Sequence, residues 1–191
     1  SESFKKLDFN VILKENLNQE KFLDVLEDFK EKQDEYDFSI IYYAGHAIQD
    51  GNGNSYILPV DFTDKKQLKD AILFNISKLL KYFDNSDNNC LMILDACRND
   101  GNLGLPKPLI EDPKNIKLAY STSFGNTASD NATLPNSLYT SILSTMLNVD
   151  GLTITNILDN TAKFVLIDTK EKQIPTHYFG VHVTNIQLKN K

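Results

Sequence analysis

The sequence predicts an α/β fold, in which helices cover both faces of a mostly parallel sheet and form a three-layer sandwich. Apolar segments of strand length alternate along the chain with longer segments whose apolar residues recur at helical spacing. In addition, the segments 38–44 and 90–94 are almost continuously apolar, which is typical of strands buried on both faces. Together these two observations favour a largely parallel sheet.

The first part of the chain is expected to hold strands, a helix and a hairpin. The segment Phe9–Leu13 is apolar except for Asn10, which predicts a short strand. Asn18 is a suitable helix cap, because apolar residues recur at helical spacing after it. After the buried strand at 38–44, the turn cluster at 50–54 indicates a hairpin whose second strand is short and covers 55–58.

The rest of the chain continues the alternation of helices and strands. A helix is predicted over 75–83, followed by the buried strand at 90–94. Several Gly and Pro residues between 99 and 114 predict a loop, and a strand follows it. The remaining elements are a strand over 116–120, helices over 137–147 and 153–167, and a last strand over 178–183.

The composition is that of an ordinary globular chain, with 191 residues, a net charge of −6 and 41% hydrophobic residues. This length predicts one domain. No apolar run approaches the ~18 residues that a membrane-spanning helix needs, and the acidic balance argues against a nucleic-acid binder. Two cysteines, Cys90 and Cys97, are too few for a disulfide-stapled secreted module, so we expect a reducing, cytoplasmic setting.

The basic residues and the histidines exclude two kinds of site. Of the 20 basic residues only Arg98 is an arginine, so a site with several bidentate guanidinium contacts cannot be built. His46, His177 and His182 are the only histidines, and no cysteine pair has short spacing, which argues against a structural zinc site. We interpret His177 and His182, near or within the last predicted strand, as structural, and Cys90 as a core residue.

Two of the buried strands end in reactive side chains. The strand over 38–44 leads to His46, and the strand over 90–94 leads to Asp95 and Cys97. Ligands of open α/β sheets bind beyond the carboxyl ends of the strands, so neighbouring strands would place these side chains at one edge. A thiol and an imidazole there form a nucleophile and its acid–base partner.

The two strand ends belong to longer motifs, Tyr42–His46 and Leu94–Arg98, and a third motif, Asn54–Asp61, lies between them. This set resembles the caspase-like cysteine peptidases, whose signature places a His about 50 residues before the catalytic Cys. Leu-Asp-Ala-Cys-Arg, in place of the Gln-Ala-Cys form, resembles the bacterial homologues, the metacaspases and the paracaspases. Similar downstream segments are Tyr120–Asp130, Asn136–Tyr139 and Gln173–Pro175, so the resemblance covers almost the whole chain.

The resemblance implies a cysteine endopeptidase in which Cys97 is the nucleophile and His46 is the general acid and base. The backbone amides of Ala47 and Cys97 would stabilise the oxyanion. Asp95 and Asp130 would line the pocket for the side chain before the scissile bond, where two carboxylates favour Arg or Lys. Cleavage after Asp would need guanidinium groups there, and the chain has one arginine. Asp130 is alternatively a loop-capping residue.

The chain departs from the family pattern in two places. Ala47 stands where the family has the second Gly of Gly-His-Gly, a change that is strained only if this position needs a positive φ. Family members also begin with a strand and a helix before the segment that resembles Phe9–Leu13. We therefore expect a single caspase-like domain over 1–191 that lacks its first strand and helix and leaves unpaired backbone groups in the sheet. Residues 99–115 would form a surface loop between parts that resemble the large and small subunits.

Two other functions remain open for this sequence. A catalytically silent caspase-like module would bind partner proteins, although such pseudo-enzymes usually lose the Cys or the His, and both are present. A phosphoacceptor or nucleotide-binding module would use Asp95 at its strand end, and it is excluded if the sheet places Cys97 beside His46.

The resemblance further implies protein substrates, an upstream sensor or activator domain, and a role as a regulated signalling or bacterial defence protease. No cofactor is implied, and no metal site is recognised. Asp61, Asp64, Asp84 and Asp87 form no calcium loop, so a calcium requirement stays open.

Overall fold

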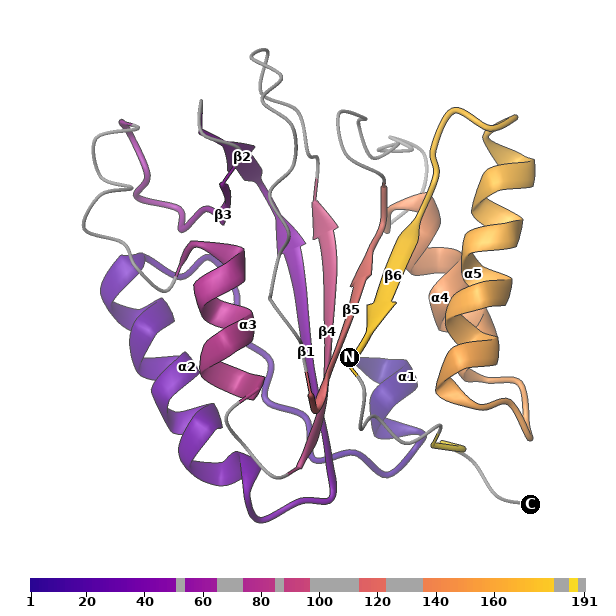
Figure 1. The fold of residues 1–191 in the computed structure, drawn as a ribbon, viewed down its shortest axis with the longest axis horizontal. Coiled ribbons are helices and arrows are strands. Elements are labelled where there is room, and N and C mark those ends of the chain that lie inside the picture. Colours follow the sequence, from indigo (N-terminus) through magenta and orange to yellow (C-terminus); the bar gives the residue numbers. More distant parts are fainter. Residues whose placement is uncertain are drawn as a thin grey trace.

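A four-stranded sheet forms the centre of the molecule (Figure 1). The computed structural model describes residues 1–50, 54–64, 74–84, 88–96, 114–122, 136–180 and 186–188. The strand order is β1-β4-β5-β6, and the strands are Phe38–Gly45, Asn89–Ala96, Ile116–Tyr120 and Thr176–Phe179 respectively. β1, β4 and β5 are parallel, and β6 is antiparallel to β5, so the predicted mostly parallel sheet is confirmed.

Helices cover both faces of this sheet (Figure 1). The helices α2 (Gln19–Gln33) and α3 (Ile76–Asp84) lie on one face. On the other face lie α4 (Leu138–Leu147), α5 (Ile154–Asp168) and the short α1 (Glu2–Lys5). The predicted three-layer arrangement is therefore confirmed.

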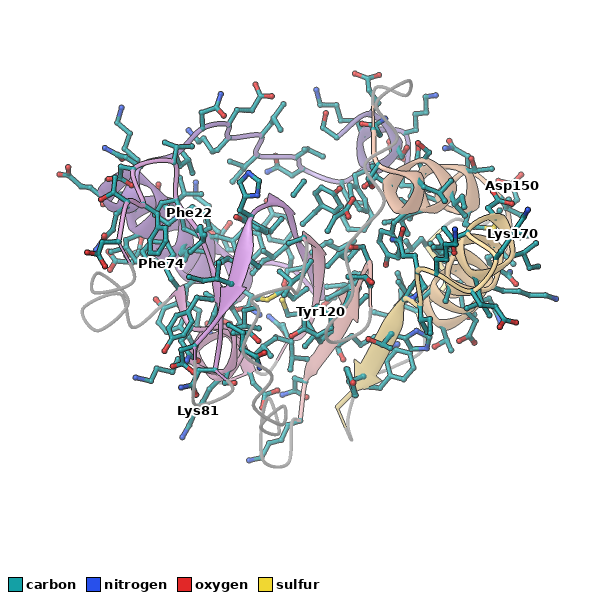
Figure 2. The ribbon with its side chains drawn as sticks, turned by 90° about the horizontal axis from the view of Figure 1, so that it is seen from above. Phe22, Phe74, Lys81, Tyr120, Asp150 and Lys170 are labelled. Atoms are coloured by element: carbon teal, nitrogen blue, oxygen red, sulfur yellow. The ribbon has the colours of Figure 1, made fainter. Side chains whose placement is uncertain are left out.

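The central strand β4 shows why the fold needs two helical layers. Its side chains alternate between the faces: Met92 and Leu94 pack in the core beneath α2 and α3, whereas Leu91 and Ile93 pack beneath α4 and α5. Figure 2, seen from above, shows Phe22 and Phe74 side by side in the first layer, with ring centroids 5.2 Å apart. A strand with apolar residues on both faces has to be covered on both.

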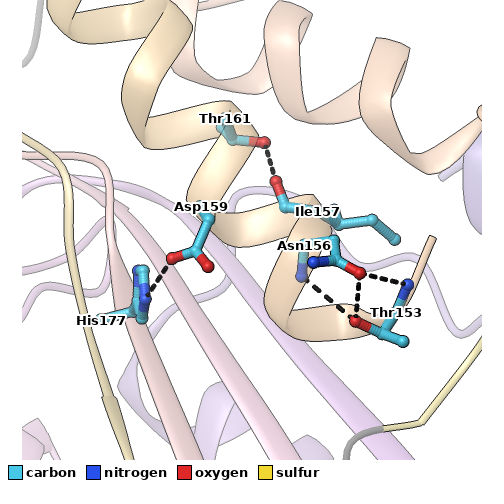
Figure 3. Close-up of polar contacts among 6 residues, drawn as sticks. All are labelled: Thr153, Asn156, Ile157, Asp159, Thr161 and His177. Carbon is cyan, nitrogen blue, oxygen red and sulfur yellow. Dashed lines mark hydrogen bonds and ion pairs between the residues drawn. The ribbon is translucent and has the colours of Figure 1, made fainter.

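Side-chain caps fix the starts of three helices. Asn18 Oδ1 accepts a hydrogen bond from the Lys21 N–H at 3.1 Å, which confirms the predicted cap of α2. Ser137 caps α4, and Thr153 caps α5 through a capping box with Asn156 (Figure 3). The predicted helices over 75–83, 137–147 and 153–167 therefore agree with α3, α4 and α5 to within about a residue at each end.

A small hairpin follows the carboxyl end of β1. β2 (Ala47–Gln49) pairs antiparallel with β3 (Ser55–Ile57), as the turn cluster between them predicted. The Asp50 carboxylate accepts hydrogen bonds from the backbone and side-chain N–H groups of Asn54 at 2.9 and 2.7 Å. These contacts hold the hairpin closed next to the end of β1.

The strand predicted over Phe9–Leu13 is wrong, because the structure has no regular element there. Asp8 and Asn16, on either side of the segment, have φ values of 61° and 53°, so the backbone turns sharply at both ends. Phe9 anchors the segment by edge contacts with Phe4 and Phe38, with ring centroids 5.7 and 6.5 Å apart. Ile12 and Leu13 are 48% and 59% exposed, so the apolar residues of this segment do not mark a buried strand.

In the described part of the chain, β1 pairs with β4 alone and forms one edge of the sheet. The last strand ends at Phe179, earlier than predicted, and residues 181–185 lie outside the described part. Within that part, no helix is both long enough and apolar enough to cross a bilayer.

Candidate active site

The candidate site lies where β1 and β4 end, at the top of the sheet in Figure 1. These two strands are parallel neighbours, and their last pairs are Ala44 with Asp95 and Gly45 with Ala96. His46 follows directly after β1, so the structure brings it to the end of β4, as predicted from the strand ends. Cys97 is bonded to Ala96 but lies outside the described residues, as does Asp130.

The backbone at His46 is fixed by the side chain of Tyr43. The Tyr43 hydroxyl donates to the His46 carbonyl oxygen at 2.8 Å and also lies 3.0 Å from the Leu58 carbonyl oxygen. The Leu58 N–H donates to the same His46 oxygen at 3.0 Å. His46 is therefore held through its backbone, while its side chain stays exposed.

Gly45 is required by this arrangement. A Cβ atom at residue 45 would lie 2.5 Å from the Tyr43 hydroxyl oxygen, far inside van der Waals contact. The Gly-His pair therefore reflects a close approach of the Tyr43 side chain to the backbone. Burial raises the pKa of Tyr43, so its hydroxyl remains a donor at neutral pH.

Ala47 tolerates its side chain without backbone strain. It lies in β2 opposite Ile57, and the described non-glycine residues with positive φ are Asp8, Asn16, Lys170 and Glu171. Because Ala47 has no positive φ, Ala in place of the second Gly of Gly-His-Gly causes no backbone strain. The role of the Ala47 amide in an oxyanion hole stays a prediction.

Asp95 is the buried carboxylate of this site, with 7% of its surface exposed. Its Oδ2 atom accepts hydrogen bonds from three hydroxyls. The Thr140 hydroxyl is 2.5 Å away and the Tyr42 hydroxyl 3.3 Å away, and the Ser137 hydroxyl makes a short contact. These donors come from β1 and from the start of α4, so Asp95 joins three elements.

The cap of α4 belongs to the same network. Ser137 Oγ accepts a hydrogen bond from the Thr140 N–H at 3.0 Å while its own proton is directed to Asp95. The N-terminus of a helix favours a nearby negative charge. Burial, followed by the charge of Asp95, raises the pKa values of Tyr42 and Tyr139. Both phenols therefore stay protonated beside the carboxylate.

The two faces of the sheet differ at the end of β4. On the face of α3, a small apolar recess lies against Ala96 and is lined by residues of the hairpin and the core. Its lining includes Ala47, Ile57, Ile76, Leu94 and Tyr120. On the opposite face lies Asp95 with its ring of hydroxyls. A substrate crossing this edge would meet an apolar surface on one side and a carboxylate on the other.

Sequence reasoning located Asp95 but assigned no role to the three hydroxyls around it. Tyr42 and Ser137 lie within segments that resemble the family, and the helical pattern after Ser137 predicts that it caps a helix. Thr140 follows Ser137 by one helical turn, so both side chains lie at the start of α4. The sequence carries no signal that this helix starts over Asp95, because that depends on how the layers pack.

The other histidine and cysteine in the described residues lie elsewhere. On β6, at the opposite edge of the sheet, His177 Nε2 lies 3.0 Å from Asp159 Oδ1 of α5 (Figure 3). Cys90 is completely buried at the start of β4, and burial raises the pKa of its thiol to about 12. Both positions support the structural roles predicted for these residues, and His182 lies outside the described part. Nowhere in that part do three His, Cys, Asp or Glu side chains form a group able to hold a metal ion.

The chain is similar in sequence to a known protein family and to known proteins. The family model of the caspase domain matches residues 1–183. The chain is 30% identical over 145 residues to a paracaspase of Dictyostelium discoideum, an alignment that covers 74% of this chain and 33% of that protein. It is 27% identical over 165 residues to the mucosa-associated lymphoid tissue lymphoma translocation protein 1 of Homo sapiens, covering 83% of this chain and 20% of that protein.

Solved structures show the same fold. Caspase-1 from Spodoptera frugiperda superposes with a TM-score of 0.69 at 19% identity, and the superposition covers 100% of this chain and 78% of that one. At this identity the likeness concerns the fold alone. The match of the family model over nearly the whole sequence, with the site at the ends of β1 and β4, shows that the chain belongs to the caspase-like cysteine peptidases.

Proposed function

We propose that the protein is a cysteine endopeptidase that cleaves proteins after Arg or Lys, with Cys97 as the nucleophile and His46 as the acid–base partner. The observation that carries this proposal is the parallel register of β1 and β4. Because Gly45 is paired with Ala96, the two strands that precede His46 and Cys97 in the sequence end at the same edge of the sheet. A nucleophile and a base that act together need this proximity.

The proposed reaction proceeds through a thioester. His46 takes the proton of the Cys97 thiol, and the sulfur attacks the carbonyl carbon of the scissile bond. The backbone amides of Cys97 and Ala47 stabilise the negative oxygen of the tetrahedral intermediate. As this collapses, the C–N bond breaks and His46 protonates the leaving amine. Water then attacks the thioester, giving the carboxylic acid product and the free thiol.

The preference for a basic side chain rests on charge. Asp95 is a buried carboxylate two residues before Cys97 in the sequence, and Asp130 is proposed as the second acid of the pocket. A guanidinium or ammonium group is the natural partner of such carboxylates. The single arginine of the chain, Arg98, cannot supply the several guanidinium groups that an aspartate pocket would need.

We further propose that the enzyme is a regulated signalling or defence protease, controlled by a sensor or activator. The chain spans about a third and a fifth of the lengths of the two relatives described above, so such control belongs to parts outside the matched region. A cytoplasmic setting follows from the cysteine content and stays part of this proposal.

Fluorogenic peptides test the reaction. Wild type, Cys97→Ala and Cys90→Ala are compared on peptides with Arg, Lys, citrulline or Asp before the fluorophore. We expect cleavage of the Arg and Lys peptides by wild type and Cys90→Ala, and none by Cys97→Ala. Cleavage that persists in Cys97→Ala would show that another residue is the nucleophile. Absence of cleavage by all three proteins, with Cys97 resistant to peptide chloromethyl ketones, would favour the silent binding module.

A further inference from the structure

We propose that Tyr42, Ser137 and Thr140 are positioning residues that present Asp95 to the substrate and thereby set the preference for a cationic side chain. This inference rests on the proposed function, because it concerns the same pocket. It adds three residues, from β1 and α4, to the site that the sequence predicted.

The hydrogen bonds to Asp95 are all on one side of its carboxylate. The hydroxyls of Ser137, Thr140 and Tyr42 are each directed to Oδ2. In the described part of the chain, no hydrogen bond reaches Oδ1, although the residue is 7% exposed. Three donors on one oxygen fix the orientation of the group and leave the other oxygen available to a further donor.

The three hydroxyls can all donate hydrogen bonds at the same time if Asp95 is an ionised carboxylate. Ser137 and Thr140 each donate to Asp95, and the Tyr42 hydroxyl, 2.5 Å from Thr140 Oγ1, donates to Thr140 or to Asp95. The Ser137 oxygen remains free to accept the Thr140 N–H, and it does so at 3.0 Å. Every proton has an acceptor when Asp95 is ionised, and hydrogen bonds to an ionised group are the stronger ones.

Asp95 lacks a cationic partner among the described residues. The ion pair between His177 and Asp159 lies at the opposite edge of the sheet and does not reach Asp95. A buried carboxylate without a cationic partner is costly even where hydroxyls and a helix N-terminus stabilise it. Ser137 alone caps α4, so capping of the helix does not explain why the hydroxyls of Thr140 and Tyr42 also contact Asp95. A substrate Arg or Lys would supply the missing charge.

Thr140 offers the cleanest variants to test this role. Thr140→Val removes the hydroxyl and keeps the shape, whereas Thr140→Ser restores a hydroxyl. Thr145→Val is the matched control, because Thr145 is exposed on the same helix and donates only to the Ser141 carbonyl oxygen, at 3.0 Å. All three changes are made in Cys97→Ala, so that binding is measured without turnover.

The measurement is calorimetric binding of two peptides that differ only in a C-terminal Arg or citrulline. We expect the Arg peptide to bind more tightly in the parent, and Thr140→Val to lower this Arg-to-citrulline ratio about tenfold or more, as loss of one hydrogen bond to a charged group predicts. Thr140→Ser and Thr145→Val should keep the parent ratio. A purely structural role of Thr140 would lower thermal stability and leave the ratio unchanged.

Two results would overturn the inference, and they are distinguishable. An unchanged ratio in Thr140→Val, with Arg preferred by the parent, would refute the positioning role alone. Equal binding of Arg and citrulline by the parent would refute the cationic pocket and this inference with it. Cleavage of peptides by the unmodified enzyme would then still support a cysteine peptidase.

Discussion

The two ends of β4 carry similar groups in opposite environments. At the amino end, Cys90 is completely buried among apolar side chains, and burial raises the pKa of its thiol to about 12. At the carboxyl end, Asp95 is almost as deeply buried, but three hydroxyls and a helix N-terminus surround it. The amino end of β4 thus contributes to the stability of the core, whereas its carboxyl end contributes a polar group to the candidate site.

The difference follows from the direction of the strands. Parallel strands in an α/β sheet place all their carboxyl ends at one edge, where loops are free to carry functional groups. The amino ends lie at the opposite edge of the sheet, where Cys90 is enclosed in the apolar core and a polar group without partners would be costly. Substitutions at the two ends are therefore expected to differ in their effects on stability and activity.

The strongest test moves a carboxylate to the amino end. Cys90→Asp would bury a charge in an apolar cluster, where it would meet the Ser39 hydroxyl instead of the three hydroxyls that surround Asp95. We expect the free energy of unfolding to fall by about 3–5 kcal/mol. Cys90→Ala, the matched control, removes one buried sulfur and should cost about 1 kcal/mol. Urea denaturation measures both. Equal stability of the two variants would mean that the amino end is as polar as the carboxyl end.

The next prediction neutralises the polar end. Asp95→Asn keeps the shape of the side chain and removes its charge, so we expect kcat/KM for an Arg peptide to fall about 100-fold, or about 2.7 kcal/mol. The same substitution should change kcat/KM for the citrulline peptide much less. A parallel loss on both peptides would instead indicate that Asp95 acts through the fold of the site.

A smaller effect is expected at Gly45. The Cβ of Gly45→Ala would collide with the Tyr43 hydroxyl, and overpacking of this kind costs about 1–3 kcal/mol. If the collision is the cause, adding Tyr43→Phe removes the opposing oxygen, and the double variant should lose less stability than the sum of the two single ones. Additive losses in a double-mutant cycle would argue against the close contact.

The smallest effect is expected for the ion pair at the far edge of the sheet. Asp159 is 56% exposed, so the solvent screens its attraction to His177. We expect Asp159→Asn to lower the free energy of unfolding by less than about 1 kcal/mol and to leave peptide cleavage unchanged. A marked loss of cleavage would show that this edge is coupled to the site.

The positions of the main buried strands, and of the residues at their carboxyl ends, could be predicted from the sequence. The apolar runs at 38–44 and 90–94 indicated buried parallel strands, and these strands brought His46 and Asp95 to one edge. The strand predicted at Phe9–Leu13 is wrong, because an apolar segment alone does not reveal the sharp turns at Asp8 and Asn16.

Contacts between layers were beyond the reach of sequence patterns. The hydroxyls of Ser137 and Thr140 lie more than 40 positions from Asp95 in the chain and meet it because α4 packs over the end of β4. Similarly, the need for Gly at position 45 depends on the orientation of the Tyr43 side chain. Both features arise from packing, which local propensity and periodicity do not encode.

The central claim is that the reactive thiol of this chain lies at the carboxyl end of β4. Labelling with a peptide chloromethyl ketone that ends in Arg, followed by mass spectrometry, tests it most directly. At pH 8 the Cys90 thiol is neutral and unreactive, since its pKa is about 12. We predict a single adduct on Cys97 that is prevented by Cys97→Ala and retained in Cys90→Ala. An adduct on Cys90, or labelling of Cys97 at equal rates by Arg and Asp reagents, would contradict the account.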